Sequence, residues 1–310
     1  MKQLICNTTA YKVFCGDKDS GKLSHAYMLH FADTQNLRAA LKIFALRFFG
    51  LDENSVDGKR LLKEALPDCR IFPEEGKKLN AEAVSAILDD SALRPLERDK
   101  KLFIICGFEQ ASALLQNKLL KTLEEPPAGV YFLLGATSLA PVLDTVRSRV
   151  KTLTVPPFTE SEILAALERK ESNPLNADAA KSCGGILGAA ENMVGGGWFK
   201  EVRAAANEIC TTVKVADIGA VAAKYGDTQY KNELLTEIQL NFYNALCALS
   251  RGDMRGQISK LWHKAALIYA IESVNKACAD VKFNAYFQGL LYDMMLRNIE
   301  ENDRWLKLQA

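Results

Sequence analysis

The sequence predicts an α/β fold in which a five-stranded parallel sheet is covered by helices on both faces and is followed by helices alone. Two observations lead to this prediction. Over roughly the first half of the chain, short runs rich in β-branched, aromatic and aliphatic residues alternate with segments of helical periodicity, as in a parallel sheet. Beyond residue 157, apolar residues recur with helical spacing. The carboxyl ends of the strands should form the ligand-binding edge.

Each element follows from its local pattern. Strands are expected at residues 26–31, 69–72, 102–106, 130–134 and 151–155. Between them, helices are expected at residues 35–49, 80–91 and 110–125. The last of these helices keeps its leucines at helical spacing and stops before Pro126. A polar turn and a short helix then connect the fourth strand to Ser148 and Arg149.

Two prolines separate the sheet domain from the helices that follow. Pro156 and Pro157 end the last strand, and Thr159 with Glu162 then gives the capping-box pattern that starts a helix. The predicted division places the α/β domain at residues 1–157, a small helical domain at 158–213 and an all-α domain at 214–310.

Composition excludes several classes of protein. The 310 residues are 48% hydrophobic, and 39 basic against 38 acidic residues leave a formal charge of +1, which does not favour strong independent binding to nucleic acid. Three histidines and eight scattered cysteines, with no C-x-x-C pair, indicate no zinc site and a reducing compartment. Because no apolar run is long enough for a signal peptide or a membrane span, we expect a cytoplasmic protein.

Two segments are candidates for a phosphate-binding loop, the first by its sequence motif and the second by its place after the first strand, and both depart from the pattern. Residues 16–22 match G-x-x-x-x-G-K, but Leu23 stands where Ser or Thr should bind Mg²⁺, so we expect a solvated loop leading into the first strand. Residues 32–37 directly follow that strand without any glycine or lysine, and Asp33 adds negative charge. We therefore expect neither segment to bind phosphate.

The third strand also lacks the acids that position Mg²⁺ and polarise water in ATPases. Cys106 and Gly107 stand in the places of these carboxylates, and Glu109 is expected to be an early-helix acid favoured by the helix dipole. The sequence thus predicts that the chain holds no nucleotide or metal of its own. The alternative is an active ATPase that uses residues 16–22 as an unusual phosphate loop.

Several segments together resemble the AAA+ clamp-loader family of bacterial DNA polymerase III. They are SHAYML at 24–29, PDCRIF at 67–72, QNKLLKTLEEPP at 116–127, VYFLLGAT at 130–137 and VRSRV at 146–150. The resemblance covers the α/β domain, which would be an AAA+ domain with a degenerate nucleotide site. It implies that the two helical domains are the family's lid and collar. In this lid, Ala189 stands where family ATPases carry a sensor arginine.

The resemblance also implies a role for Arg149. The family's Ser-Arg-Cys motif falls on Ser148, Arg149 and Val150, which makes Arg149 an arginine finger acting in trans, with Ser148 supporting it. A planar, permanently charged guanidinium suits this role because it can stabilise charge on a γ-phosphoryl group. ATP and Mg²⁺ would then be held by the neighbouring subunit.

The implied function is that of a non-hydrolysing subunit of a hetero-oligomeric clamp loader in DNA replication. Its partners would be gamma- or tau-type ATPase subunits and a delta subunit, with indirect contact to the sliding clamp and primed DNA. Lys118 and Lys121 could face DNA, although a solvated helix face, with Lys121 paired to Glu125, is the simpler interpretation. Arg147 is expected at the surface or facing DNA. A plain scaffold with an idle Arg149 is the remaining alternative.

Overall fold

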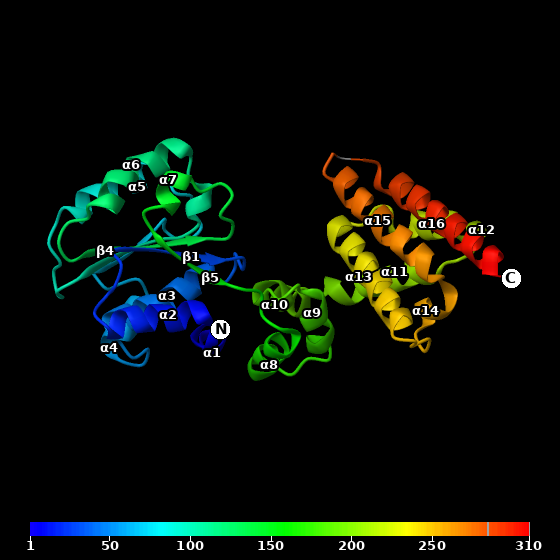
Figure 1. The fold of residues 1–310 in the computed structure, drawn as a ribbon, viewed down its shortest axis with the longest axis horizontal. Helices are drawn as coiled ribbons and strands as arrows, with labels where there is room; N and C mark the ends of the chain where they lie inside the picture. Colours follow the sequence, from blue (N-terminus) through cyan, green and yellow to red (C-terminus); the bar gives the residue numbers. More distant parts are fainter. Residues whose placement is uncertain (284, 310) are drawn as a thin grey trace. The chain divides into compact units, whose positions relative to one another are not determined.

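The computed structural model describes residues 1–283 and 285–309 of the chain (Figure 1). The chain divides into two compact units, Met1–Asn192 and Met193–Ala310. Each unit is built around its own buried core, and the first contains the sheet.

The sheet has five strands in the order β2-β3-β4-β1-β5, and every neighbouring pair is parallel. The strands are β1 (Ala26–Phe31), β2 (Cys69–Phe72), β3 (Lys101–Ile105), β4 (Val130–Ala136) and β5 (Lys151–Val155). Met28 of the central strand β1 pairs with Leu134 on one side and Thr152 on the other. The predicted five-stranded parallel sheet is confirmed, with strand ends within two residues of those expected.

Helices cover both faces of this sheet (Figure 1). One face carries α1 (Lys2–Asn7), α2 (Thr9–Asp19), α3 (Leu37–Phe49) and α4 (Val56–Leu62). The other face carries α5 (Ala81–Ser91), α6 (Ala113–Glu124) and α7 (Asp144–Arg147), and a short 3₁₀ turn, η1 (Phe108–Gln110), follows β3. Helix α3 approaches β4 closely because Gly135 has no side chain, and a Cβ there would lie 2.6 Å from Leu41 Cδ1.

The N-terminal segment forms helices α1 and α2, which the sequence patterns did not predict. Phe14 of α2 is 2% exposed and packs edge-on against Tyr27 of β1 and Phe44 of α3, with ring centroids 5.0 and 5.2 Å away. Because α2 extends to Asp19, Gly16 lies in its last turn. The prediction of a solvated loop over residues 16–22 was wrong for its first part, because packing of Phe14 onto the sheet holds the helix in place.

Three short helices follow β5: α8 (Glu160–Lys170), α9 (Asn176–Ser182) and α10 (Leu187–Gly195). The capping box that starts α8 is confirmed. Thr159 Oγ1 accepts the Glu162 backbone N–H at 3.3 Å, and Glu162 Oε2 accepts the Thr159 backbone N–H at 2.9 Å.

All regular secondary structure among the described residues of the second unit is helical. It contains α11 (Trp198–Thr211), α12 (Val215–Tyr225), α13 (Lys231–Ser250), α14 (Gln257–Leu261), α15 (Lys264–Val281) and α16 (Phe287–Gln309). Buried residues of α11, α13, α15 and α16 share one core, in which Trp262 Nε1 donates to the Cys210 carbonyl at 2.7 Å. Because α11 packs in this core, the predicted boundary between residues 213 and 214 falls inside the second unit. The division into three domains stays a prediction.

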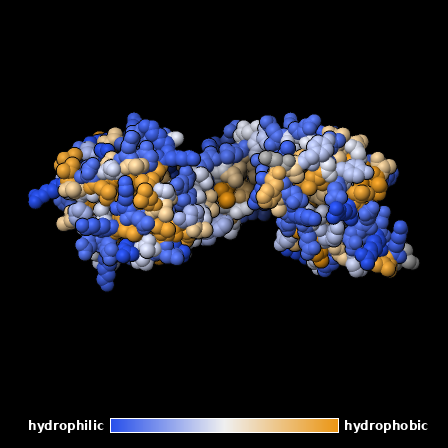
Figure 2. Space-filling view, turned by 90° about the horizontal axis from the view of Figure 1, so that it is seen from above, coloured by the Kyte–Doolittle hydropathy of each residue, from blue (hydrophilic) through white to orange (hydrophobic). Residues whose placement is uncertain are grey.

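Polar and apolar side chains are mixed over the visible face of each unit (Figure 2). Among the described residues, every helix is too short or too polar to cross a membrane.

Candidate functional site

Arg149 lies between the short helix α7 and strand β5. Its sequence neighbours Val146 and Val150 are buried in the apolar core that includes sheet residues such as Phe132. Arg149 keeps 31% of its side chain exposed. The two valines therefore fix the backbone of this segment while the guanidinium stays at the surface.

Three hydrogen bonds hold the guanidinium of Arg149. Nε donates to Glu124 Oε2 at 3.1 Å, and Nη1 donates to the Thr145 carbonyl at 2.9 Å and to Ser148 Oγ at 3.5 Å. The Ser148 hydroxyl donates to the same Thr145 carbonyl at 3.1 Å. Nη2 makes no hydrogen bond to a described residue, so one end of the donor fork is open. The structure thus brings the predicted pair Ser148 and Arg149 into contact.

The loop after β1 contains a buried carboxylate where this type of fold would hold phosphate. Asp33 is 1% exposed. Its Oδ1 accepts the Asn36 backbone N–H at 3.1 Å, and its Oδ2 accepts the Asn36 side-chain amide at 2.9 Å and the Gly188 backbone N–H at 2.8 Å. Asn36 is the N-cap of α3 and Gly188 lies in the first turn of α10. Both backbone donors belong to helix N-termini, which favour an anion, and Asp33 supplies it.

The contact between this loop and α10 is tight. A Cβ on Gly188 would lie 2.5 Å from Asp33 Oδ1 and 2.8 Å from Gln35 Cβ. One turn further along α10, Glu191 Oε1 accepts Lys170 Nζ at 3.1 Å. Protein atoms therefore fill the space between the β1 loop and α10 at this point.

A cavity of about 250 Å³ lies beside this loop, at the carboxyl edge of the sheet. Cys106, Glu109 and Thr137, from the segments after β3 and β4, contribute to its lining. Glu109 lies in η1, a three-residue 3₁₀ turn that precedes α6, and its Oε1 accepts the Thr137 hydroxyl at 2.6 Å. Its Oε2 is buried without a hydrogen-bond partner among the described residues. Burial raises the pKa of the Cys106 thiol to about 11, so the thiol is neutral at physiological pH.

Arg38 brings a cation to the same cavity, but that cation is already paired. Its Nε and Nη2 donate to the two oxygens of Glu64 at 2.6 and 2.5 Å, and Nη1 donates to the Pro73 carbonyl at 2.9 Å. The hydrogen bonds from Arg38 lower the pKa of Glu64 to about 2. Among the described residues, no cluster of His, Cys, Asp or Glu side chains has a metal-binding arrangement.

The amide groups of the Gly16–Lys22 segment are used by the end of α2. The backbone N–H groups of Ser20, Gly21 and Lys22 donate to the carbonyls of Gly16, Lys18 and Asp17 at 2.8–3.1 Å. The Asp17 carboxylate accepts the Tyr27 hydroxyl at 2.7 Å and Lys151 Nζ at 2.5 Å. Donors that a phosphate loop would direct toward its ligand are therefore turned back on the helix, which argues against the ATPase alternative.

Comparison with known proteins shows that this chain is similar to subunits of DNA polymerase III. Residues 6–159 match a family described as DNA polymerase III, delta subunit. The DNA polymerase III subunit delta' of Bacillus subtilis is 30% identical over 170 residues, which are 53% of this chain and 51% of that protein. The delta' subunit of Haemophilus influenzae is 38% identical over 88 residues, 28% and 27% of the two chains. This chain is a clamp-loader family member related to delta-prime.

The similarity spans about half of the Bacillus relative and about a quarter of the Haemophilus relative. Among solved structures, a DNA polymerase III gamma subunit-related protein of Thermotoga maritima covers 93% of this chain and 98% of its own, with 13% identity and a TM-score of 0.45. The Bacillus subtilis clamp loader delta protein covers 94% and 100%, with 11% identity and a TM-score of 0.36.

In this clamp-loader family member, Lys118 and Lys121 are exposed on α6. Neither lysine forms a side-chain ion pair with a described residue, and the pair between Lys121 and Glu125 that the sequence suggested is not formed. Arg147 is paired with Asp144 at 3.3 Å. The two lysines therefore remain available on one face of the helix that ends at Glu124.

Sequence patterns did not identify Gln116, which ties α6 to the segment that leads into α7. Gln116 is 1% exposed. Its Nε2 donates to the carbonyls of Ala111 and Pro141 at 3.0 and 3.1 Å, and its Oε1 accepts the Leu143 backbone N–H at 2.9 Å. A single polar residue on the buried side of an otherwise apolar helix face was the available signal.

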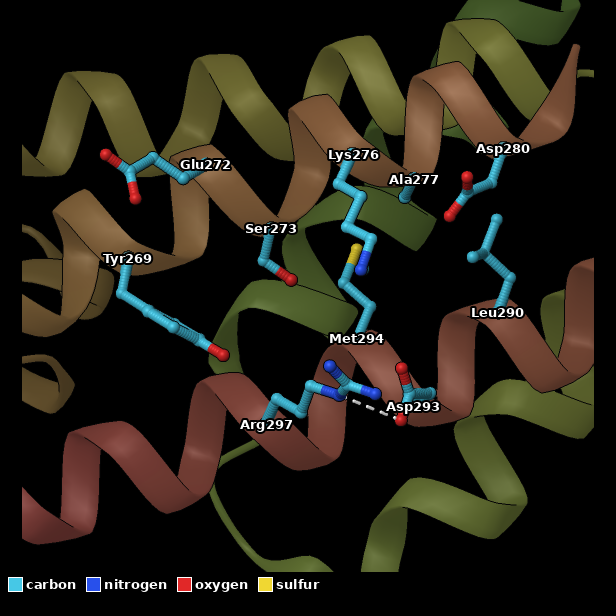
Figure 3. A pocket seen from close by; sticks show the side chains of 10 residues that line it. All are labelled: Tyr269, Glu272, Ser273, Lys276, Ala277, Asp280, Leu290, Asp293, Met294 and Arg297. Atoms are coloured by element: carbon cyan, nitrogen blue, oxygen red, sulfur yellow. Dashed lines mark hydrogen bonds and ion pairs between the residues drawn. The ribbon is translucent and has the colours of Figure 1, made fainter.

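A second cavity of about 250 Å³ lies between α15 and α16 in the helical unit (Figure 3). Lys276 and Arg297 reach into the space between the helices from opposite sides, and Arg297 Nε pairs with Asp293 at 3.0 Å. Acidic and basic side chains alternate around this cavity, so its lining favours neither sign of charge.

Proposed function

We propose that this chain is a non-hydrolysing subunit of the DNA polymerase III clamp loader. In this proposal Arg149 acts in trans on ATP and Mg²⁺ that a neighbouring gamma- or tau-type subunit holds. A delta subunit belongs to the same assembly, and the sliding clamp and primed DNA are reached through the assembled loader.

The observation that carries the proposal is the surface position of the Arg149 guanidinium. Buried Val146 and Val150 anchor its backbone, and Nη2 is left without a partner among the described residues. An open, permanently charged nitrogen on a rigid support is what stabilisation of a neighbour's γ-phosphoryl group needs. The buried Asp33 carboxylate supports the other half of the proposal, since it occupies the position where phosphate would bind in this chain.

The test is ATP turnover by a loader reconstituted with variants of this chain. An arginine finger is worth about 10³–10⁵ in rate, so Arg149→Ala should reduce DNA-stimulated hydrolysis at the adjoining site by a factor of this order. Arg149→Lys should not restore it, because an ammonium lacks the planar donor fork. Co-elution of the subunits on a sizing column should be unchanged.

Arg147→Ala is the matched control. Arg147 lies two residues away, and its side chain is 46% exposed in a local pair with Asp144. Its removal should leave turnover at the adjoining site unchanged when primed DNA is saturating, so that any contact of Arg147 with DNA does not enter the comparison. If Arg149→Ala behaves like this control, the trans-acting role is wrong and the scaffold alternative is favoured.

A further inference from the structure

Glu124 is the side chain that reaches Arg149 from another helix. It is the last residue of α6, and its Oε2 accepts a hydrogen bond from Arg149 Nε at 3.1 Å. The other partners of the guanidinium, Thr145 and Ser148, lie within one turn of Arg149 in the sequence. Glu124 therefore connects the arginine-bearing segment to the helix that precedes β4.

Helix energetics does not favour an acid at this place. The C-terminal end of a helix carries partial negative charge, so a last-turn position favours a cation and disfavours a carboxylate. The Glu124 side chain is 56% exposed and that of Arg149 is 31% exposed, and ion pairs this exposed add little to folding stability. The consequence of the pair is therefore the orientation of Arg149 more than the stability of the fold.

The contacts define the plane of the guanidinium. Its donors are arranged in a rigid planar fork, and two of its nitrogens are held by different elements, Nε by Glu124 and Nη1 by the Thr145 carbonyl. With these two nitrogens fixed, the position of the open Nη2 is fixed as well. Without Glu124, the hydrogen bonds of the guanidinium to the described residues would be those of Nη1 alone.

We propose that Glu124 is a positioning residue for Arg149. It holds the guanidinium plane so that Nη2 meets the phosphoryl group of the adjoining subunit, and this inference rests on the proposed function. Misplacement of a catalytic group by about 1 Å can reduce a rate on the order of 10²-fold. Because positioning acts on the transition state, the loss should appear in kcat and leave the KM for ATP unchanged.

The experiment measures kcat and KM for DNA-stimulated ATP hydrolysis by the reconstituted loader. Glu124→Ala should lower kcat at the adjoining site by about 10- to 100-fold with KM unchanged. Glu124→Gln keeps the shape of the side chain and one acceptor oxygen, and should retain most of the rate. Glu125→Ala is the matched control, because Glu125 is the next residue, is exposed and forms no ion pair with a described residue.

The double variant Glu124→Ala/Arg149→Ala separates positioning from a general effect on the structure. If Glu124 acts through Arg149, the double variant should be no slower than Arg149→Ala alone. A further loss in the double variant, or a Glu124→Ala variant as active as wild type, would overturn the inference while a slow Arg149→Ala still supports the proposed function. If Arg149→Ala is itself fully active, the proposed function fails. Should Glu124→Ala lower the melting temperature of the chain, Glu124→Leu, which is a good helix former without an acceptor oxygen for Arg149 Nε, carries the same comparison.

Discussion

Asp33 accepts a hydrogen bond from the Gly188 backbone N–H at 2.8 Å, although 155 residues separate the two in the sequence. Asp33 belongs to the loop after the central strand and Gly188 to the first turn of α10. The same carboxylate accepts both donors of Asn36 at the start of α3. One buried side chain therefore satisfies donors from two helix N-termini and joins α10 to the sheet.

Removal of this carboxylate should loosen α10. In Asp33→Ala the buried N–H of Gly188 loses its acceptor, which costs about 1–3 kcal/mol for an unsatisfied buried group. Amide hydrogen exchange at residues 187–190 should become faster, and the free energy of unfolding should fall by a similar amount. Glu168→Ala, which removes an exposed carboxylate of α8, is the control and should alter neither quantity.

A methyl group at Gly188 should also destabilise the chain, against the trend for helices. Replacement of glycine by alanine inside a helix normally raises the free energy of unfolding by as much as about 1 kcal/mol. At Gly188 the new Cβ would lie 2.5 Å from Asp33 Oδ1, so Gly188→Ala should instead cost about 1–3 kcal/mol through overpacking. Gly219→Ala in α12 has nothing within 4 Å of its Cβ and should be neutral or stabilising in the same denaturant titration. Equal effects of the two changes would contradict the tight contact.

The sheet was predictable from the sequence because buried parallel strands read as short continuous apolar runs. Helix α2 was not, since Phe14 is held by Tyr27 and Phe44, which are distant in the sequence. The negative charge of Asp33 was recognised as unsuited to phosphate, but its acceptor role depends on Gly188. Contacts of this kind appear only when the fold brings the two segments together.

The same limit applies to the candidate site. Resemblance to a family assigned a role to Arg149, whereas the contacts of Glu124 with Arg149 and of Gln116 with Leu143 could not be read from the sequence. Both lie on α6, and Leu143 and Arg149 are 27 and 25 residues further along the chain than Gln116 and Glu124. The residue that performs a reaction can be inferred from a motif, but the residues that orient it follow from packing.

Lys118 and Lys121 should contribute to DNA binding by the assembled loader if they contact phosphates. Each phosphate contact that is lost should reduce the slope of log K against log salt by about 1. Lys118→Ala and Lys121→Ala should therefore weaken binding of primed DNA, measured by fluorescence anisotropy at several salt concentrations. Lys170→Ala, on α8 and paired with Glu191, serves as the control. An unchanged slope in both α6 variants would favour the solvated helix face.

The Glu64 carboxylate should make the chain sensitive to acid. Its pKa is lowered from 4.5 to about 2 by hydrogen bonds from Arg38, so folding favours the ionised form. The resulting stabilisation is fully present above pH 4.5 and is lost as the pH falls through 4.5 toward 2. Between about pH 5 and pH 2, wild type should lose more unfolding free energy than Glu64→Gln, which has no carboxylate to protonate. Glu75→Gln, at an exposed position nearby, should follow the wild-type profile.

Titration of the chain with a fluorescent ATP analogue and Mg²⁺ should show no saturable binding. At the end of α2, the amides of Ser20, Gly21 and Lys22 are already bonded to helix carbonyls, and in the β1 loop Asp33 occupies the anion position. Lys22→Ala should therefore leave the titration unchanged, and this outcome separates the proposal from an ATPase that uses residues 16–22.

Asp33→Ala is the informative companion, because it removes the internal anion without restoring the glycines and lysine of a phosphate loop. Asp33→Ala should therefore bind free phosphate at the helix N-termini no more than weakly. Tight, Mg²⁺-dependent ATP binding by wild type that disappears in Lys22→Ala would instead show that the chain has a working nucleotide site.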